Sequence, residues 1–361
     1  MYPHNTATVA QIGEFDELID VRAPAEYAED HLPGAISAPV LNDAERERIG
    51  TLYVQVSPFE AKKVGAALVA INIARHLQEK FHDRPKSWRP LVYCWRGGMR
   101  SGSMVEIFSR IGWPVAQLSG GYKAYRRHVI EQLTQLPGKL ELRIVCGPTG
   151  SGKSRLLRTL GGIGAQVLDL EALACHRGSV LGHLPDEAQP SQKMFESRLW
   201  QALQGYAPGA PVFVEAESKK VGGLHVPDAL MLRMRAAPCL RVELADGARV
   251  ALLKQEYAHF LADPARLNQQ LDILVALHGR ARVAEWKGLS DAGDWDVLVG
   301  RLLAEHYDPA YLRGMARNFS GYEAAPAVAI EGIDEAAFER AARQAVAVAA
   351  TPGSVPAGGV R

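Results

Sequence analysis

The chain has 361 residues, of which 47% are hydrophobic and 22% are charged, a balance typical of a soluble globular protein with two domains of ordinary size. Its 41 basic and 40 acidic side chains leave a net charge of +1. That balance excludes binding of nucleic acid through a global positive field, so any such binding must use local basic patches.

The first part of the chain alternates between segments of strand and helix character. Strands are predicted at 17–21, 91–93 and 115–118, and helices at 25–29, 61–81 and 101–111. Pro33 and Gly34 mark a turn between the first helix and the segment that follows. This alternation predicts a parallel sheet covered by helices on both faces.

A second series of strands and helices begins after a domain boundary at 136–139. Strands are predicted at 142–146, 165–169, 211–215 and 239–244, a helix at 153–160, and mainly helical structure from 248 to 348. The tail is rich in Gly, Pro and Ala and has little to bury, which predicts disorder. The expected domains are therefore 1–135 and 139–348, with a disordered tail at 349–361.

A short loop that could hold an anion follows the strand at 91–93. It comprises Cys94, Trp95, Arg96, Gly97, Gly98, Met99, Arg100 and Ser101. Two glycines allow backbone amides to turn inward, and a helix starting near Ser101 adds positive potential that would stabilise a thiolate. Arg96 and Arg100 can hold oxyanions through paired hydrogen bonds. The loop therefore predicts a nucleophilic Cys94, and its Cys-x5-Arg spacing also matches cysteine-dependent phosphatases.

The first 130 or so residues resemble a rhodanese domain. The resemblance rests on Asp20-Val21-Arg22 with Glu26-Tyr27, on 31–35 (HLPGA), and on 119–122 (SGGY). It places Cys94 at the position of the family's persulfide cysteine. The loop is one residue longer than the usual sulfurtransferase loop, which favours a larger, phosphate-like anion such as selenophosphate.

A phosphate-binding loop of the form G-x-x-x-x-G-K-S follows the strand at 142–146. Its candidate binding residues are Gly147, Thr149, Gly150, Ser151, Gly152, Lys153 and Ser154. Lys153 would reach terminal phosphates, and Ser154 could hold Mg²⁺; no other metal ligand is identified.

Supporting residues are expected on the neighbouring strand ends and loops. They are Asp169, His176, Arg177, Glu215, Lys219 and Lys220. Asp169 and Glu215 are the two candidate acids for metal or water positioning. A P-loop NTPase usually carries Asp at such a position, so Glu215 argues against hydrolysis of a nucleotide.

The whole chain up to about residue 340 closely resembles the bacterial tRNA 2-selenouridine synthases. The thiol loop, the phosphate loop, 176–179 (HRGS) and 217–220 (ESKK) carry this resemblance. It implies an α/β fold, with an N-terminal rhodanese-like parallel-sheet domain and a P-loop NTPase-like α/β domain that has a helical C-terminal part.

The resemblance also implies the chemistry. Sulfur of 2-thiouridine at the tRNA wobble position is replaced by selenium, with selenophosphate and geranyl diphosphate as co-substrates and an S-geranylated intermediate. Cys94 with Arg96 and Arg100 would serve the selenophosphate step, and Lys153 with Lys219 or Lys220 would bind the diphosphate. The implied partners are this tRNA and a selenophosphate-supplying enzyme, with no membrane, and a monomer is expected.

Three other functions fit parts of the pattern. They are an ATP-dependent sulfurtransferase–kinase fusion without an RNA substrate, a cysteine-dependent phosphatase with a regulatory nucleotide domain, and a tRNA-binding module without catalysis. ATP turnover without tRNA would favour the first, and hydrolysis of an aryl phosphate would favour the second. Intact Cys94 and Lys153 argue against the third.

Bulk features bear on location and on RNA contacts. Cys94, Cys146, Cys175 and Cys239 form no C-x-x-C pair, which argues against disulfides and structural zinc. No apolar run reaches the roughly 18–20 residues of a membrane span, and the start of the chain lacks signal-peptide character, so a cytoplasmic protein is expected. Candidate basic spots for tRNA phosphates are 126–128, Arg233 with Arg235, and Arg280 with Arg282.

Overall fold

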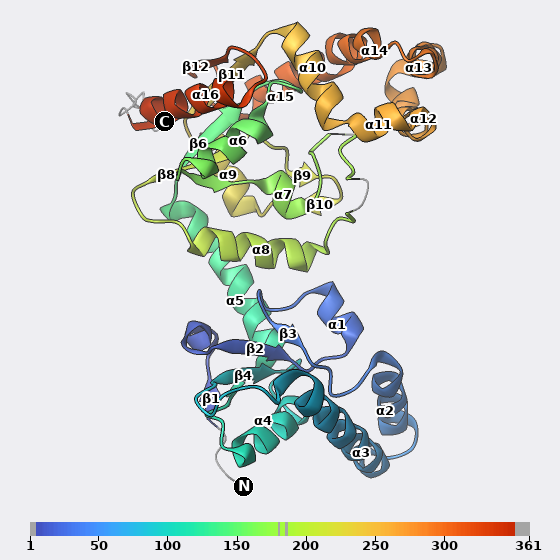
Figure 1. Cartoon of the computed structure of the whole chain (residues 1–361), viewed down its shortest axis with the longest axis vertical. Coiled ribbons are helices and arrows are strands. Elements are labelled where there is room, and N and C mark those ends of the chain that lie inside the picture. Colours follow the sequence, from blue (N-terminus) through green and yellow to red (C-terminus); the bar gives the residue numbers. More distant parts are fainter. Residues whose placement is uncertain (1–4, 180, 185–186, 351–361) are drawn as a thin grey trace, which may run out of the picture. The chain divides into compact units, whose positions relative to one another are not determined.

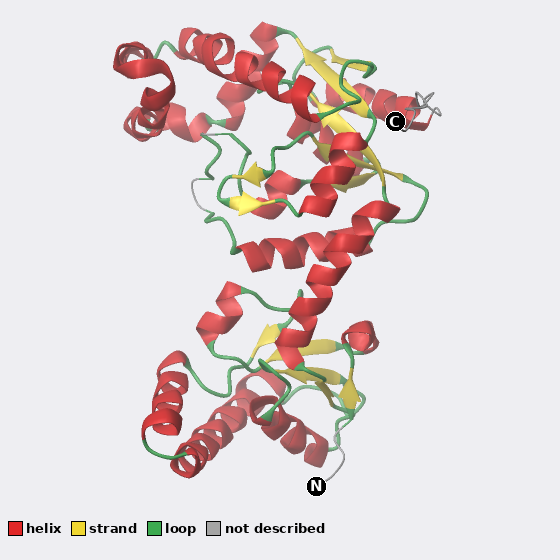
Figure 2. Ribbon diagram, turned by 180° about the vertical axis from the view of Figure 1, so that it is seen from behind, coloured by secondary structure: helices red, strands yellow, loops and turns green. Residues whose placement is uncertain are grey.

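The computed structural model describes residues 5–179, 181–184 and 187–350. Its contacts divide the chain into two compact units (Figures 1 and 2). Unit 1 comprises Met1–Gln132 and Pro190–Gln201, and unit 2 comprises Leu133–Gln189 and Ala202–Arg361. Each unit is built on its own five-stranded sheet, so the expected pair of α/β domains is confirmed.

The sheet of unit 1 has the order β1-β5-β4-β2-β3, and every pairing in it is parallel. Its strands are β1 (Thr6–Ala7), β2 (Glu17–Asp20), β3 (Ile36–Ser37), β4 (Pro90–Tyr93) and β5 (Ala116–Leu118). Strand β4, which leads into the thiol loop, lies between β5 and β2 and is buried along its whole length. Burial on both faces explains the continuous apolar character of this strand.

Helices cover this sheet, and the apolar side chains between the helices and the strands form the hydrophobic core of unit 1. The helical elements are η1 (Val9–Glu14), α1 (Pro24–Glu29), α2 (Asp43–Gln55), α3 (Pro58–His76), the π-helical η2 (Leu77–Phe81), α4 (Met99–Ile111) and α5 (Gly121–Gln135). Helix α3 begins three residues before the predicted helix because Ser57 caps it, accepting hydrogen bonds from the amides of Phe59 and Glu60. Phe81, Trp88 and Phe108 pack together beneath α3 and α4.

Unit 1 also contains most of a helix that comes from much later in the chain, α8 (Gln192–Gln204). The Trp200 ring lies edge-on to the Tyr125 ring, with centroids 5.5 Å apart, and Arg126 forms an ion pair with Glu196. Lys193 pairs with Glu29 at 2.6 Å. Segment 190–201 is therefore an integral part of the rhodanese-like unit.

The sheet of unit 2 has the order β12-β11-β6-β8-β7, again with every pairing parallel. Its strands are β6 (Glu141–Cys146), β7 (Gln166–Leu168), β8 (Pro211–Glu215), β11 (Cys239–Leu244) and β12 (Ala327–Ile330), and a separate antiparallel pair comprises β9 (Lys220–Val221) and β10 (Leu224–His225). Strand β6, which precedes the phosphate loop, is the central strand. The sequence prediction missed β12, because a four-residue edge strand of Ala, Val and Ile gains its identity only by pairing with β11.

The remaining helices cover this sheet and form a helical region from α10 to α15. They are η3 (Leu136–Lys139), α6 (Lys153–Gly162), α7 (Leu170–Ala174), α9 (Asp228–Ala236), α10 (Asp246–Glu256), α11 (Ala258–Ala262), α12 (Pro264–Leu271), η4 (Asp272–Leu274), α13 (Val275–Ala292), α14 (Trp295–Leu302), the π-helical η5 (Leu303–Tyr307), α15 (Asp308–Asn318) and α16 (Glu335–Ala350). The predicted mainly helical character after residue 248 is confirmed. None of the described helices combines the length and apolarity needed to cross a membrane.

The end of the chain packs against the sheet of unit 2. The Phe338 side chain of α16 is fully buried in a core shared with α6 and the strands. Helix α16 includes Ala349 and Ala350, the first two residues of the expected tail. The rest of that tail, 351–361, lies outside the described residues.

Candidate functional site

Cys94 lies at the carboxyl end of β4, at the start of the loop that leads into α4. Its Sγ accepts hydrogen bonds from the Ser101 hydroxyl at 3.1 Å and from the Gly98 amide at 3.3 Å. Burial acts to raise the pKa of the Cys94 thiol, but these bonds outweigh it, and the pKa lies below its usual value. The loop therefore stabilises a thiolate at Cys94.

The glycine-rich segment 119–122 closes against the thiol loop. Gly121 has φ of +57°, and a side chain on it would approach the Cys94 carbonyl oxygen to 2.3 Å. The Tyr122 amide donates to that same oxygen at 2.8 Å. The segment thus fixes the backbone of the nucleophile, which explains the need for glycine.

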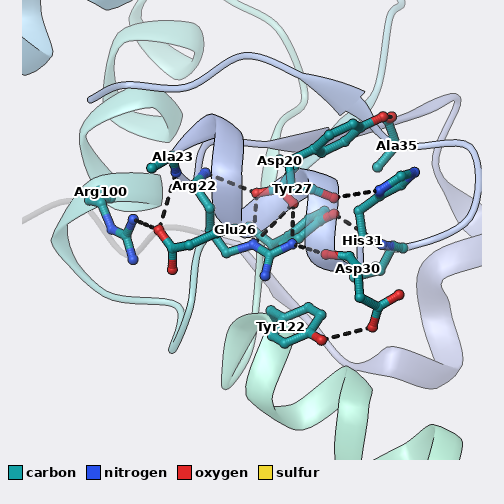
Figure 3. A network of polar contacts seen from close by, with 12 residues as sticks. Asp20, Arg22, Ala23, Glu26, Tyr27, Asp30, His31, Ala35, Arg100 and Tyr122 are labelled. Atoms are coloured by element: carbon teal, nitrogen blue, oxygen red, sulfur yellow. Dashed lines mark hydrogen bonds and ion pairs between the residues drawn. The ribbon is translucent and has the colours of Figure 1, made fainter. Parts of the chain in front are cut away.

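The predicted arginines of the loop have different surroundings. Arg96 is exposed. Arg100 donates to Glu26 at 2.8 Å, and this contact lowers the pKa of Glu26 in spite of the opposing effect of burial (Figure 3). Arg96 is therefore the more available of the two for an anion, and Arg100 would have to share its guanidinium with Glu26.

The motif 20–35 supplies a buried polar network next to the thiol loop (Figure 3). Arg22 binds Asp20 through two nitrogens and donates to the Asp30 carbonyl at 2.6 Å. Tyr122 donates to the Asp30 carboxylate at 2.7 Å, and its ring lies 3.9 Å from the Arg22 guanidinium. These contacts connect the end of α1 to strand β2, so the motif stabilises the fold of the unit.

The second candidate site is the loop between β6 and α6. Gly152 ends it with φ of +85°, where a side chain would come within 2.8 Å of the Phe338 ring. The Lys153 ammonium donates to the Gly147 and Pro148 carbonyls at 2.6 and 3.2 Å, and the Gly147 amide donates to the Tyr311 hydroxyl at 2.5 Å. The predicted strand–loop–helix context of a phosphate nest is present.

Arg249 on α10 supports this loop from outside it. Its side chain is only 6% exposed, and it donates to the Thr149 carbonyl at 2.8 and 3.1 Å. The same guanidinium forms paired bonds with Asp308 at 2.6 and 3.0 Å. Arg249 therefore connects the phosphate loop to α15. This role could not be predicted, because Arg249 lies 100 residues from Thr149 in the sequence.

The carboxylates of Asp169, Glu171 and Glu217 line one pocket with Lys153, and that of Glu215 is buried near them. Glu171 accepts from the Ser154 hydroxyl at 2.9 Å, and Glu215 accepts from the Glu171 amide at 2.9 Å. Asp169 caps α7 by accepting from the Ala172 amide at 2.8 Å. Neither of the two predicted acids contacts Ser154. That contact is made by Glu171, for which no role was predicted.

Burial raises the pKa of each of these acids. For Asp169 and Glu171 burial is the main cause, and for Glu215 the charges of Asp169 and Glu171 add to it. Burial and the charge of Glu171 raise the pKa of Glu217 to about 8. Of these acids, Glu217 thus exchanges its proton near pH 8.

Replacing Glu217 by glutamine is expected to stabilise the protein more at pH 8.5 than at pH 5. The folded state keeps the Glu217 proton up to about pH 8, whereas the unfolded chain releases it near the ordinary value of 4.5. Stability is therefore lost as pH rises through this window, and a neutral glutamine avoids the loss. Urea unfolding at both pH values should show a relative gain of roughly 1–3 kcal/mol at the higher pH. The control is Glu47→Gln on exposed α2; a Glu217→Gln effect that does not vary with pH would contradict the prediction.

The predicted basic residues divide into two groups. His176 is buried, and Arg177 donates to the Glu256 carbonyl at 2.6 Å and lies over the Tyr257 ring; both line the pocket beside the phosphate loop. Lys219 and Lys220 are exposed and do not line that pocket. Lys219 pairs with Asp228 at 2.7 Å. The structure therefore does not bring this lysine pair to Lys153.

The pocket beside the phosphate loop has a volume of about 630 Å³. Lys153, Ser154, Glu171 and Glu217 line it, together with Tyr311. A narrow apolar pocket of about 60 Å³ adjoins it and shares Thr149, Leu253, Tyr257 and Tyr307 with it. The other residues of the apolar pocket are Leu181, Lys254, Phe260, Leu261, Leu267, Trp295, Leu298, Val299, Leu302 and Leu303.

Each of the three basic spots expected to meet tRNA contains an arginine that contacts another residue of the protein. Arg126 is paired with Glu196, and Arg233 donates to the Leu140 carbonyl at 3.0 Å. Arg127 and Arg235 are exposed. Arg282 is paired with Glu305 at 2.7 Å. Arg280 is exposed as well, so Arg127, Arg235 and Arg280 are the better candidates for phosphate contacts.

A thiolate loop on a parallel α/β unit and a phosphate nest on a second α/β unit define a rhodanese-like and P-loop fusion enzyme. Residues 6–128 match the rhodanese-like domain, and residues 140–272 match the tRNA 2-selenouridine synthase AAA domain. The chain belongs to the tRNA 2-selenouridine synthase family.

Two relatives named as tRNA 2-selenouridine synthases support this membership. The chain is 32% identical over 326 residues to the tRNA 2-selenouridine synthase of Alcanivorax borkumensis, covering 81% of this chain and 88% of the relative. It is 35% identical over 247 residues to that of Nitrosomonas europaea, covering 66% of this chain and 63% of the relative. A solved N-terminal domain of a putative ATP/GTP binding protein from Clostridium difficile is 36% identical, covers 35% of this chain and 98% of that domain, and has a TM-score of 0.31.

Proposed function

We propose that this protein replaces the sulfur of 2-thiouridine at the wobble position of tRNA with selenium, in two steps. Geranyl diphosphate first alkylates the sulfur, and selenophosphate then delivers selenium. The observation that carries the proposal is an apolar pocket that adjoins the phosphate nest, in a chain of this family. Such a pair of pockets suits a substrate with a diphosphate at one end and a hydrocarbon chain at the other.

The first step makes the sulfur a leaving group. The sulfur attacks C1 of the geranyl group, diphosphate departs, and the base loses its N3 proton. Glu217 lines the pocket, and its pKa of about 8 makes its carboxylate form a strong base, so this form is our candidate acceptor for that proton, with activity expected to rise toward pH 8. In the second step selenium attacks C2 and expels geranyl thiol, and water then releases phosphate from the Se–P bond.

The loop at 147–154 would hold the diphosphate. The loop precedes the N-terminus of α6, which favours an anion, and the Lys153 ammonium at the start of that helix supplies a positive charge. The Ser154 hydroxyl and the Glu171 carboxylate are adjacent oxygen donors, which suits Mg²⁺. The described residues contain no group of three His, Cys, Asp or Glu side chains placed to hold a metal. Phosphate oxygens of the substrate would therefore supply further ligands to Mg²⁺, and the ion would offset their negative charge.

The narrow apolar pocket would take the geranyl chain in an extended form. Replacing Val299 by phenylalanine should fill this pocket and raise the KM for geranyl diphosphate by roughly tenfold, because apolar contact area is lost. The matched control is Val297→Phe on the same helix, since Val297 is exposed and outside the pocket. An equal effect of both variants would exclude this position for the chain.

The test of the whole proposal is mass spectrometry of nucleosides from tRNA that contains 2-thiouridine. Geranyl diphosphate alone should give the S-geranyl nucleoside, and both co-substrates together should give 2-selenouridine. Formation of 2-selenouridine without geranyl diphosphate would contradict the two-step order. ATP consumption without tRNA would instead favour the sulfurtransferase–kinase alternative.

A further inference from the structure

Gln117, on the sheet of unit 1, contacts the thiol loop through its side chain. Gln117 lies on β5, which pairs with β1 on one side and β4 on the other, and its backbone amide donates to the Asn5 carbonyl at 2.9 Å. Its residue exposure is only 9%. Strand pairing on both sides and burial hold this side chain in one place.

The amide of Gln117 makes two contacts in the thiol loop. Nε2 donates to the Ser101 hydroxyl oxygen at 2.7 Å and to the Gly98 carbonyl at 3.0 Å. A carbonyl oxygen can only accept, so the amide nitrogen, and not the amide oxygen, must face the loop. The direction of both bonds is therefore fixed.

These two bonds decide where the Ser101 proton goes. The hydroxyl has one proton and two acceptors in reach, Sγ of Cys94 at 3.1 Å and the Gly98 carbonyl at 3.3 Å. Gln117 uses a lone pair of the hydroxyl, and the two lone pairs of the Gly98 carbonyl are already taken by Gln117 and by the Gly102 amide, which donates at 3.0 Å. The sulfur is then the acceptor left for the Ser101 proton.

We propose that Gln117 is a positioning residue that directs the Ser101 hydroxyl proton at Sγ of Cys94. It touches no reacting atom and acts only through Ser101. The inference concerns the thiolate itself, so it holds whichever group Cys94 attacks and does not depend on the proposed selenation.

The charged groups around the thiol loop can also affect the pKa of Cys94, and they are the same in every variant compared below. Arg96 lies on the loop and is exposed, Arg100 on α4 is paired with Glu26 of α1, and Arg22 is paired with Asp20 after β2. None of these groups is changed in the variants below, so their effect on Cys94 is common to all of them.

The experiment measures the pH dependence of Cys94 alkylation by iodoacetamide in the full chain, followed on the Cys94 peptide by mass spectrometry. Gln117→Met keeps the size of the side chain and removes its donor. It should raise the apparent pKa of Cys94 by roughly 0.5–1, and slow alkylation at pH 7 by about 3- to 10-fold. Gln55→Met, on exposed α2, is the control and should leave the profile unchanged.

Two further variants keep the test decisive. In the double variant Ser101→Ala/Gln117→Met, the second change should add nothing to Ser101→Ala, because Gln117 acts through the hydroxyl. Gln117→Glu accepts the Ser101 proton itself and should raise the Cys94 pKa more than Gln117→Met does. An unchanged profile in a folded Gln117→Met protein, or a further shift in the Ser101→Ala background, would overturn the proposal.

Discussion

Replacing Cys94 by serine is expected to abolish selenation of tRNA while geranylation continues. The structure gives this thiol a depressed pKa through the Ser101 hydroxyl and loop amides, and a serine hydroxyl at the same position stays protonated at neutral pH. Selenation should fall by roughly 10³-fold or more. The measurement is nucleoside mass spectrometry with both co-substrates present, in which the S-geranyl nucleoside should accumulate.

The control for this change is Cys175→Ser, because Cys175 belongs to unit 2 and is not part of the thiol loop. That variant should make 2-selenouridine at the wild-type rate. If Cys94→Ser also does so, the thiol has no catalytic part in selenium transfer. If it loses geranylation as well, the assignment of separate steps to the two loops is wrong.

Replacing Lys153 by alanine is expected to abolish geranyl transfer, and with it the selenation that depends on the alkylated base. The ammonium lies within 2.6 Å of the Gly147 carbonyl, at the edge of the nest where negative charge builds up on a departing diphosphate. Loss of one such charge should slow geranyl transfer by about 10²- to 10³-fold. The assay is formation of the S-geranyl nucleoside from geranyl diphosphate alone.

Lys219→Ala and Lys220→Ala provide the comparison. The structure pairs Lys219 with Asp228 and leaves both lysines outside the pocket, so geranyl transfer should persist in both variants. A loss as large as that of Lys153→Ala would restore the role that the sequence pattern predicts for this pair. Supplying purified S-geranylated tRNA to Lys153→Ala should recover selenation, which separates the two steps.

The two loops could be predicted from sequence because each is contiguous and each follows an apolar strand. Their supports could not be predicted. Arg249 contacts Thr149 across 100 residues, and Gln117 reaches Ser101 from a neighbouring strand. Such contacts come from the way strands pair and helices pack, and local sequence carries no mark of them.

The acids show the same limit in another form. Asp169 and Glu215 stand at strand ends, where sequence reasoning expects functional carboxylates. The Ser154 contact goes instead to Glu171, the second residue of α7, whose N-cap is Asp169. Placement on a strand end indicated the right edge of the sheet but not the right side chain.

The position of α8 in unit 1 has a consequence for synthesis on the ribosome. Tyr125 is fully buried with Trp200 against it, so the rhodanese-like unit is incomplete until residues 190–201 have emerged. At about 5–20 residues per second, the 69 residues from 132 to 201 take roughly 3–14 s to make. During that time β6, the phosphate loop and β7 are already outside, and the nascent chain must hold an unfinished first unit while the second begins to fold.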